Sequence, residues 1–119
     1  MKITEAEWSV LEVLWSGDKF SLGEITNDLM PVKKWSRNTV HTYLTRMERK
    51  GLVKIDKSSS EPYSAGVTKE ACAKEERQEL LDKVYGGSAG SLITAFLKES
   101  NISKEEVDKL RKLLDEMEV

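Results

Sequence analysis

The chain has 119 residues, a formal net charge of −2 and a single cysteine, Cys72. This length suits one domain or a small domain with an appendage, and one cysteine excludes an internal disulfide and a multi-thiolate metal site. The sequence shows no signal-peptide pattern and no apolar run near the roughly 20 residues that cross a bilayer. We therefore expect a cytoplasmic protein without membrane insertion.

The acidic net charge hides an uneven distribution. Residues 1–32 carry two basic and six acidic side chains, and residues 58–119 carry nine basic and thirteen acidic ones. Residues 33–57 carry eight basic side chains and two acidic ones, a net of +6. A basic segment concentrated in one part of an acidic chain is typical of a surface that meets phosphate groups.

Two helices are predicted at the N-terminal end, each opened by a capping box. Thr4 and Ser21 are both followed three residues later by Glu, the pattern in which side chain and backbone cap each other. The first helix is predicted to run to about Trp15. The second is predicted to run to about Met30, because a proline follows it directly.

The third predicted helix begins at Ser36 and ends at Gly51. At about 100° per residue, Leu44 and Met47 fall within about 40° of Val40, so these three form the buried stripe. An ordinary solvated face mixes Glu with Lys and Arg. The opposite half of this helix instead carries amide, hydroxyl and guanidinium groups, which contact phosphates and base edges. A solvated face that merely lacks acids is the alternative. The residues on this half are Asn38, His41, Thr42, Thr45, Arg46 and Arg49.

After the third helix the apolar period changes from helical to alternating. The segment LVKIDK (52–57) alternates, SSSEP (58–62) predicts a turn, and YSAGV (63–67) predicts a return strand. Three short helices and a hairpin form the winged helix-turn-helix layout, whose third helix enters the major groove. Near the hairpin tip, Lys57 is predicted to contact a phosphate.

The remaining sequence predicts three further helical segments. Thr68 caps a helix that runs to about Tyr85, where two glycines break it. The stretch SLITAFLKES (91–100) adds a short apolar segment. Ser103 and Glu106 form a third capping box and open the last helix.

We predict that this C-terminal part forms a dimer. The fold is then mainly α with a small β-hairpin: a winged helix domain over residues 1–68 and a helical dimerisation domain over residues 69–119. The later helices carry more apolar surface than so small a module covers, and unburied stripes of this size mark an interface. Folding back onto the N-terminal core is the alternative. The predicted interface residues are Leu81, Val84, Tyr85, Leu92, Phe96, Val107, Leu110 and Leu114.

Five stretches together carry a resemblance to a known family. They are AEWSVLEVLW (6–15), WSRNTVHTYLTRMERKG (35–51), KVYGG (83–87), SLITAFL (91–97) and ISKEEVDKLRKLL (102–114). They resemble the penicillinase-repressor family of bacterial transcriptional repressors, the BlaI and MecI type of β-lactam resistance. The second stretch is the specific one, because a generic winged helix shares only its apolar spacing.

The resemblance implies a homodimeric repressor without a cofactor, bound through its winged helix to inverted repeats in double-stranded DNA. Relatives often carry Arg or Lys where this chain has His41, so the base preference at that position is expected to differ. The DNA contacts carried over by resemblance are Asn38, Thr39, His41, Thr42 and Arg46; the neighbouring basic residues Arg37, Arg49 and Lys57 complete the predicted set.

Two departures bear on regulation. The copper-responsive branch of the family has paired C-terminal cysteines, whereas this chain ends LLDEMEV, so a metal site is not expected. In the β-lactam branch, a membrane sensor-protease system leads to cleavage between Asn and Phe in the dimerisation domain. The corresponding bond here is Ala95–Phe96. Cleavage there is the predicted route to release, although the regulated genes need not be β-lactamase genes.

Other function classes fit the sequence less well. An enzyme is not expected, because one His, one Cys and no Gly-rich phosphate loop leave no constellation for nucleophile and base. His41 has no second His in the chain and no carboxylate three or four residues away with which to bind a metal. A winged-helix protein-interaction module, or a repressor of unrelated genes with a different signal, stays open as the alternative.

Overall fold

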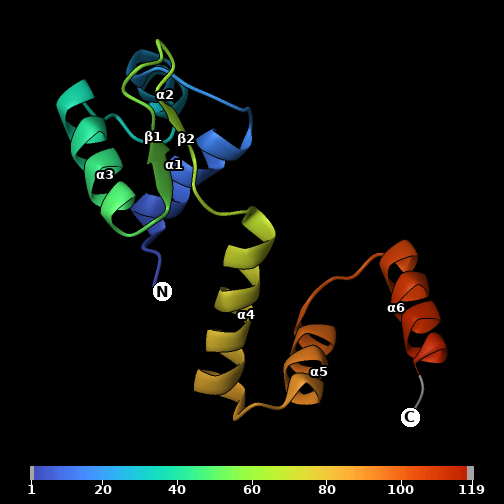
Figure 1. The fold of residues 1–119 in the computed structure, drawn as a ribbon. Helices are drawn as coiled ribbons and strands as arrows, with labels where there is room; N and C mark the ends of the chain where they lie inside the picture. The colour runs from blue at the N-terminus through green and yellow to red at the C-terminus, as the bar shows by residue number, and fades with distance from the viewer. Residues whose placement is uncertain (1, 118–119) are drawn as a thin grey trace. The chain divides into compact units, whose positions relative to one another are not determined.

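The computed structural model describes residues 2–117 and divides the chain into two compact units, residues 1–75 and 76–119. Figure 1 shows the helices of the first unit grouped around a hairpin. Its elements are α1 (Glu5–Trp15), α2 (Leu22–Leu29), α3 (Arg37–Arg49), β1 (Val53–Ile55), β2 (Tyr63–Ala65) and the start of α4 (Lys69–Tyr85). The second unit holds the rest of α4, α5 (Ala89–Glu99) and α6 (Lys104–Glu116).

The predicted mainly α fold with one small hairpin is confirmed, and the predicted helix ends lie within a few residues of the observed ones. Capping explains this agreement, because it acts within one turn of the chain. At α1, Thr4 Oγ1 accepts from the Glu7 amide at 3.2 Å while Glu7 Oε1 accepts from the Thr4 amide at 2.9 Å. Ser21 and Glu24 form the same reciprocal pair of hydrogen bonds at the start of α2.

The third predicted capping box is only half formed. Ser103 Oγ accepts from the Glu106 amide at 3.2 Å, as expected of the cap of α6. The Glu106 carboxylate, however, accepts from the Ser103 hydroxyl at 3.2 Å instead of reaching the backbone amide of the same residue. The side-chain hydroxyl competes with its own backbone for this acceptor, and the sequence pattern cannot distinguish the two outcomes.

The sheet is slightly larger than the predicted two-stranded hairpin. Phe20, in the connection between α1 and α2, exchanges two backbone hydrogen bonds with Tyr63 at 2.9 and 3.0 Å. The hairpin is thereby tied to the helices through backbone pairing as well as side-chain packing. Its own strands are antiparallel, in the register Val53↔Ala65, Lys54↔Ser64 and Ile55↔Tyr63.

The N-terminal unit has one apolar core, to which each of the first three helices contributes. The predicted stripe of α3, Val40, Leu44 and Met47, is completely buried. Full burial of a side chain of this kind stabilises a fold by about 1.5–3 kcal/mol. Cys72, in the first turn of α4, is buried in the same core. This explains why the compact N-terminal unit extends beyond residue 68, the predicted domain boundary.

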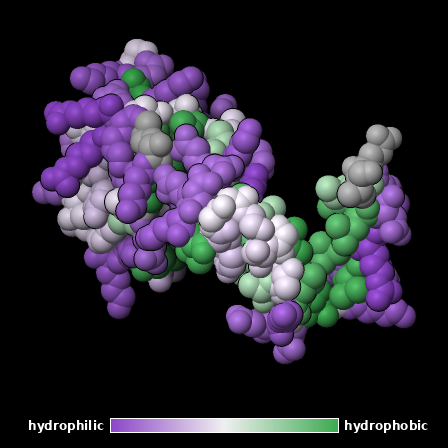
Figure 2. All heavy atoms as spheres, turned by 90° about the horizontal axis from the view of Figure 1, so that it is seen from below, coloured by the Kyte–Doolittle hydropathy of each residue, from purple (hydrophilic) through white to green (hydrophobic). Residues whose placement is uncertain are grey.

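The C-terminal unit has no such core among its described residues. No side chain from residue 76 to 117 is buried, and Val84, Phe96 and Leu114 are each more than half exposed. Figure 2 shows hydrophobic side chains lying open on this part of the chain. Among the described residues, every helix is too short or too polar to cross a lipid bilayer.

Candidate nucleic-acid interface

The N-terminus of α3, the positive end of its helix dipole, has no acidic side chain in its first turn. Ser36 caps the helix by accepting from the Thr39 amide at 3.2 Å, and the two hydroxyl oxygens lie 3.1 Å apart. The first turn of α3 contains no acidic residue, in contrast to α1 and α2. The unpaired amides and the helix dipole therefore favour an anion at this end, where Arg37 begins the helix.

The predicted contact face of α3 is open to solvent. Its side chains come mainly from the half of the helix opposite the buried stripe; Thr39 and Thr45 are half-buried, and the others are exposed. Glu48 is also exposed and lies two turns after His41 along nearly the same line. An acid therefore borders the face on the His41 side, and the remainder of the face is free of acids. The exposed residues of the predicted contact set on α3 are Arg37, Asn38, His41, Thr42, Arg46 and Arg49.

Two threonines on this face have their hydroxyl protons engaged within the helix. Thr42 Oγ1 donates to the carbonyl of Asn38 at 2.9 Å, and Thr45 Oγ1 donates to the carbonyl of His41 at 3.0 Å. A hydroxyl has one proton to donate, so outward these residues present a methyl group and lone pairs. Thr42 is thus better suited to an apolar contact, such as a thymine methyl, than to donation to a phosphate.

An aromatic stack at the entry to α3 was not anticipated from the sequence. Trp35 stacks on Tyr43 with ring centroids 4.5 Å apart and planes 8° from parallel. The ammonium of Lys33 lies 5.8 Å from the centre of the Trp35 ring. Such contacts hold the segment before α3 against the helix. The only sequence signal for this stack is the spacing of Trp35 and Tyr43, about two helical turns apart. Because Trp35 precedes the helix, helical periodicity does not predict the contact.

Lys50, counted in the basic segment, is engaged inside the protein. Its Nζ lies 2.7 and 2.8 Å from the two carboxylate oxygens of Glu7 and 3.2 Å from the carbonyl of Lys2. Burial by itself raises the pKa of Glu7, but hydrogen bonds from Lys50 and Thr4 outweigh it and lower the pKa below its ordinary 4.5. Glu7 is therefore ionised at neutral pH and cancels the charge of Lys50.

The hairpin tip is held by short-range hydrogen bonds. The Asp56 carboxylate accepts from the Ser58 hydroxyl at 2.6 Å and from its amide at 3.1 Å, which lowers the pKa of Asp56. The Asp56 amide donates across the turn to Pro62 at 2.8 Å. Lys54 and Lys57 are exposed. The wing thus offers two solvated ammonium groups next to one ionised carboxylate.

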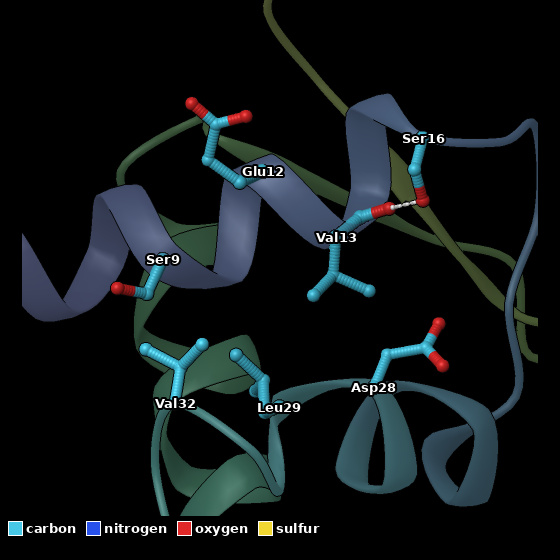
Figure 3. Close-up of a pocket in the computed structure, with 7 residues that line it drawn as sticks. All are labelled: Ser9, Glu12, Val13, Ser16, Asp28, Leu29 and Val32. Atoms are coloured by element: carbon cyan, nitrogen blue, oxygen red, sulfur yellow. Dashed lines mark hydrogen bonds between the residues drawn. The ribbon is translucent and has the colours of Figure 1, made fainter.

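The N-terminal unit also has a groove between α1 and α2 (Figure 3). Its cavity volume is about 410 Å³, and Val13 and Leu29 point toward one another across it. The Glu12 carboxylate points away from the groove and is engaged by Trp8 Nε1 at 3.0 Å and by Lys69 at 3.2 Å. The side chains that line the groove include no histidine, cysteine or lysine to pair with its hydroxyls as a base.

The predicted dimerisation residues lie on the helices of the C-terminal unit, and none is buried in the single chain. Val84, Phe96 and Leu114 are exposed, and the other five are half-buried. The Ala95–Phe96 bond lies inside α5, whose backbone continues as helix on both sides. A protease needs an extended segment, so local unwinding of α5 must precede cleavage there.

Comparison with known proteins assigns the chain to a family. A family model described as penicillinase repressor matches residues 3–116. The chain belongs to the penicillinase repressor family. Proteins of this family are transcriptional repressors and not enzymes, which confirms both the predicted resemblance and the prediction that this chain is not an enzyme.

Individual relatives extend this assignment along nearly the whole chain. The penicillinase repressor of Staphylococcus aureus is 29% identical over 118 residues, which cover 98% of this chain and 94% of the relative. The methicillin resistance regulatory protein MecI of Staphylococcus aureus strain N315 is 28% identical over 115 residues, covering 96% and 94%. The family likeness therefore includes both units of this repressor.

One solved structure is similar to part of this repressor. It is the solution structure of the monomeric form of BlaI from Bacillus licheniformis, in complex with the blaP half-operator. The TM-score is 0.52 at 25% sequence identity, and the match covers 59% of this chain and 87% of that chain. A winged helix regulator thus shares the fold of more than half of this repressor.

Proposed function

We propose that this repressor is a homodimer that binds inverted-repeat operators in double-stranded DNA, with α3 in the major groove. The observation that carries the proposal is the exposed face of α3, where amide, imidazole and guanidinium groups stand together without an acid at its centre. These groups match the edges of bases and the phosphate oxygens. The complex of BlaI with a half-operator supports the same use of the fold.

The proposed contacts divide by chemistry. Asn38 and Arg46 read base edges, since an amide pairs with adenine and a guanidinium with guanine. Thr42 presents its methyl group, because its hydroxyl proton is bound to Asn38. His41 reads a base edge with its imidazole nitrogens. The remaining contacts, to phosphates, come from the helix start, its basic end and the wing: Arg37, Thr39, Arg49 and Lys57.

Dimerisation is proposed through the apolar stripes of the C-terminal unit. One small basic module binds a half-site weakly at physiological salt, whereas two tethered modules gain about 10²- to 10⁴-fold when their spacing matches the site. The open side chains of α4, α5 and α6 supply the surface for this tether. On this proposal the dimerisation domain begins near residue 69, although the first turn of α4 is packed in the N-terminal core.

Release is proposed to follow cleavage at Ala95–Phe96, in a cytoplasmic protein that answers to a membrane sensor-protease system. The exposed Phe96 ring and the short helix around it support access once α5 unwinds. Cleavage removes α6 and part of α5 from each subunit, so the dimer loses half of its proposed interface residues. The proposed targets are genes of the β-lactam-resistance type, in keeping with the family.

The test uses the full chain and a duplex with an inverted repeat selected by this protein from a randomised library. Binding is titrated by gel shift at several salt concentrations, alongside a duplex with one half of the repeat. We expect affinity to fall steeply with salt, and the single half-site to bind at least about 100-fold more weakly. If no duplex is enriched and binding ignores salt, a protein-interaction module is the correct function instead.

A further inference from the structure

The ammonium of Lys50 has three acceptors around it, all within the protein. The two oxygens of Glu7 and the carbonyl of Lys2 lie between 2.7 and 3.2 Å from Nζ. A lysine ammonium has three protons to donate. With these bonds made, Lys50 has no proton left for a phosphate oxygen, although it lies in the most basic segment of the chain.

The same contact joins the ends of two helices. Lys50 is the C-terminal cap of α3, and Glu7 stands in the first turn of α1, where its carboxylate also caps the Thr4 amide. The Glu7 side chain is 7% exposed and that of Lys50 is 35% exposed. A charge pair with these short distances and one nearly buried partner resists displacement by water or by phosphate.

We propose that Lys50 is a positioning residue for operator recognition: its ion pair with Glu7 fixes the end of α3 against α1, and Lys50 makes no phosphate contact. The proposal rests on the proposed DNA-binding function. Base-edge contacts require placement to within a fraction of an ångström, whereas sequence-independent binding depends on charge alone. The pair should therefore matter for selectivity between DNA sequences and leave the salt dependence unchanged.

The test compares Glu7→Gln, Lys50→Met and the double variant with wild-type protein, and uses Lys57→Ala as the matched control for a phosphate contact. Each is titrated against the selected inverted-repeat duplex and against an unrelated duplex of equal length. Titrations run over a range of salt, at a temperature where circular dichroism shows each variant folded. Glu7→Gln keeps the acceptor for Thr4 and keeps the Lys50 charge, so it decides the question even if Lys50→Met does not fold.

A positioning role for Lys50 and a phosphate contact by Lys50 predict opposite results. If Lys50 positions α3, both single variants lose about three- to thirtyfold in affinity for the selected duplex, bind the unrelated duplex within about twofold and keep the wild-type salt slope. The double variant, whose net charge equals that of wild type, regains thermal stability but not selectivity. Lys57→Ala instead weakens both duplexes and lowers the slope by about one unit.

Each of three outcomes overturns the proposal. The first is that Lys50→Met lowers the salt slope as Lys57→Ala does, and the second is that Glu7→Gln strengthens binding because it frees a cation. The third is that the folded variants keep wild-type selectivity, in which case the pair serves stability alone. Failure of the proposed function looks different, because wild-type protein then selects no duplex at all.

Discussion

The two units of this repressor follow the same local rules and differ in what happens to their apolar side chains. Serine or threonine caps open helices in both, and both carry apolar stripes at helical spacing. In the N-terminal unit, Leu11 and Leu44 are completely buried. In the C-terminal unit, no described side chain is buried, and Leu114 is 58% exposed.

The apolar core of the N-terminal unit is complete within one chain, whereas the apolar stripes of the C-terminal unit need a second surface to cover them. Short helices gain most of their stability in water from packing their apolar face, not from helix propensity. The N-terminal unit buries its stripes within one chain, so its stability should be independent of protein concentration. The helices of the C-terminal unit should become stable only when their stripes are covered, which makes their stability depend on concentration.

The largest expected effect comes from matched leucines in the two units. Leu11→Ala should lower the free energy of unfolding of the N-terminal unit by about 2–5 kcal/mol, because it empties a packed core. Leu114→Ala should leave that unit unchanged and weaken the dimer. Urea unfolding at two protein concentrations 100-fold apart distinguishes the two changes. A concentration-independent loss in Leu114→Ala would place this leucine in a core of its own chain.

Removing the C-terminal part should have the next largest effect. A fragment of residues 1–95 should sediment as a monomer and bind the selected inverted repeat at least about 100-fold more weakly than the full chain, because the tether is lost. The full chain provides the reference in sedimentation and in titration. A fragment that stays dimeric and binds as tightly contradicts both the interface assignment and release by cleavage.

A change on the contact face should affect binding but neither unit's stability. Arg46→Ala should lower operator affinity by about 1–3 kcal/mol, since its guanidinium is exposed on the acid-free half of α3. Arg77→Ala, in α4 and outside the basic segment, is the matched control and should bind as wild type does. Gel-shift titration and thermal melts of both variants test this. Equal binding by both variants rules out the assigned role of α3.

The smallest effect concerns acid stability. The pKa of Glu7 is lowered in the folded protein, so its ion pair stabilises the fold above the ordinary carboxyl range and this contribution is lost as pH falls through and below about 4.5. Wild-type stability should therefore fall more steeply than that of Glu7→Gln on acidification. Urea midpoints between pH 7 and pH 3 measure this.

Part of the acid dependence should survive in the variant. Glu24 and Asp56 also have lowered pKa values, held by hydrogen bonds from Ser21 and Ser58. Identical pH profiles for wild type and Glu7→Gln would show that the Lys50–Glu7 pair does not stabilise the folded state.

Sequence alone determined the order and ends of the helices, the hairpin and the outward face of α3. Each depends on neighbours within a few residues: a cap and its acid three positions on, a glycine after a helix, or apolar residues returning every three or four positions. The fully buried Val40, Leu44 and Met47 were predictable for this reason. Because the opposite half of the helix follows from the same geometry, most of the candidate site was predictable as well.

Only the tertiary structure decided which charges and rings are already engaged. Lys50 meets Glu7 across 43 residues of chain, and Trp15 donates to the Val67 carbonyl at 2.9 Å across 52. Phe20 pairs with Tyr63 of the sheet, and these two residues are as far apart in the sequence as Lys50 and Glu7. No local pattern encodes such pairs, because they form when separate elements are packed on one core. For that reason the charge pattern alone includes Lys50 in the basic segment, whereas the folded chain holds its ammonium against Glu7.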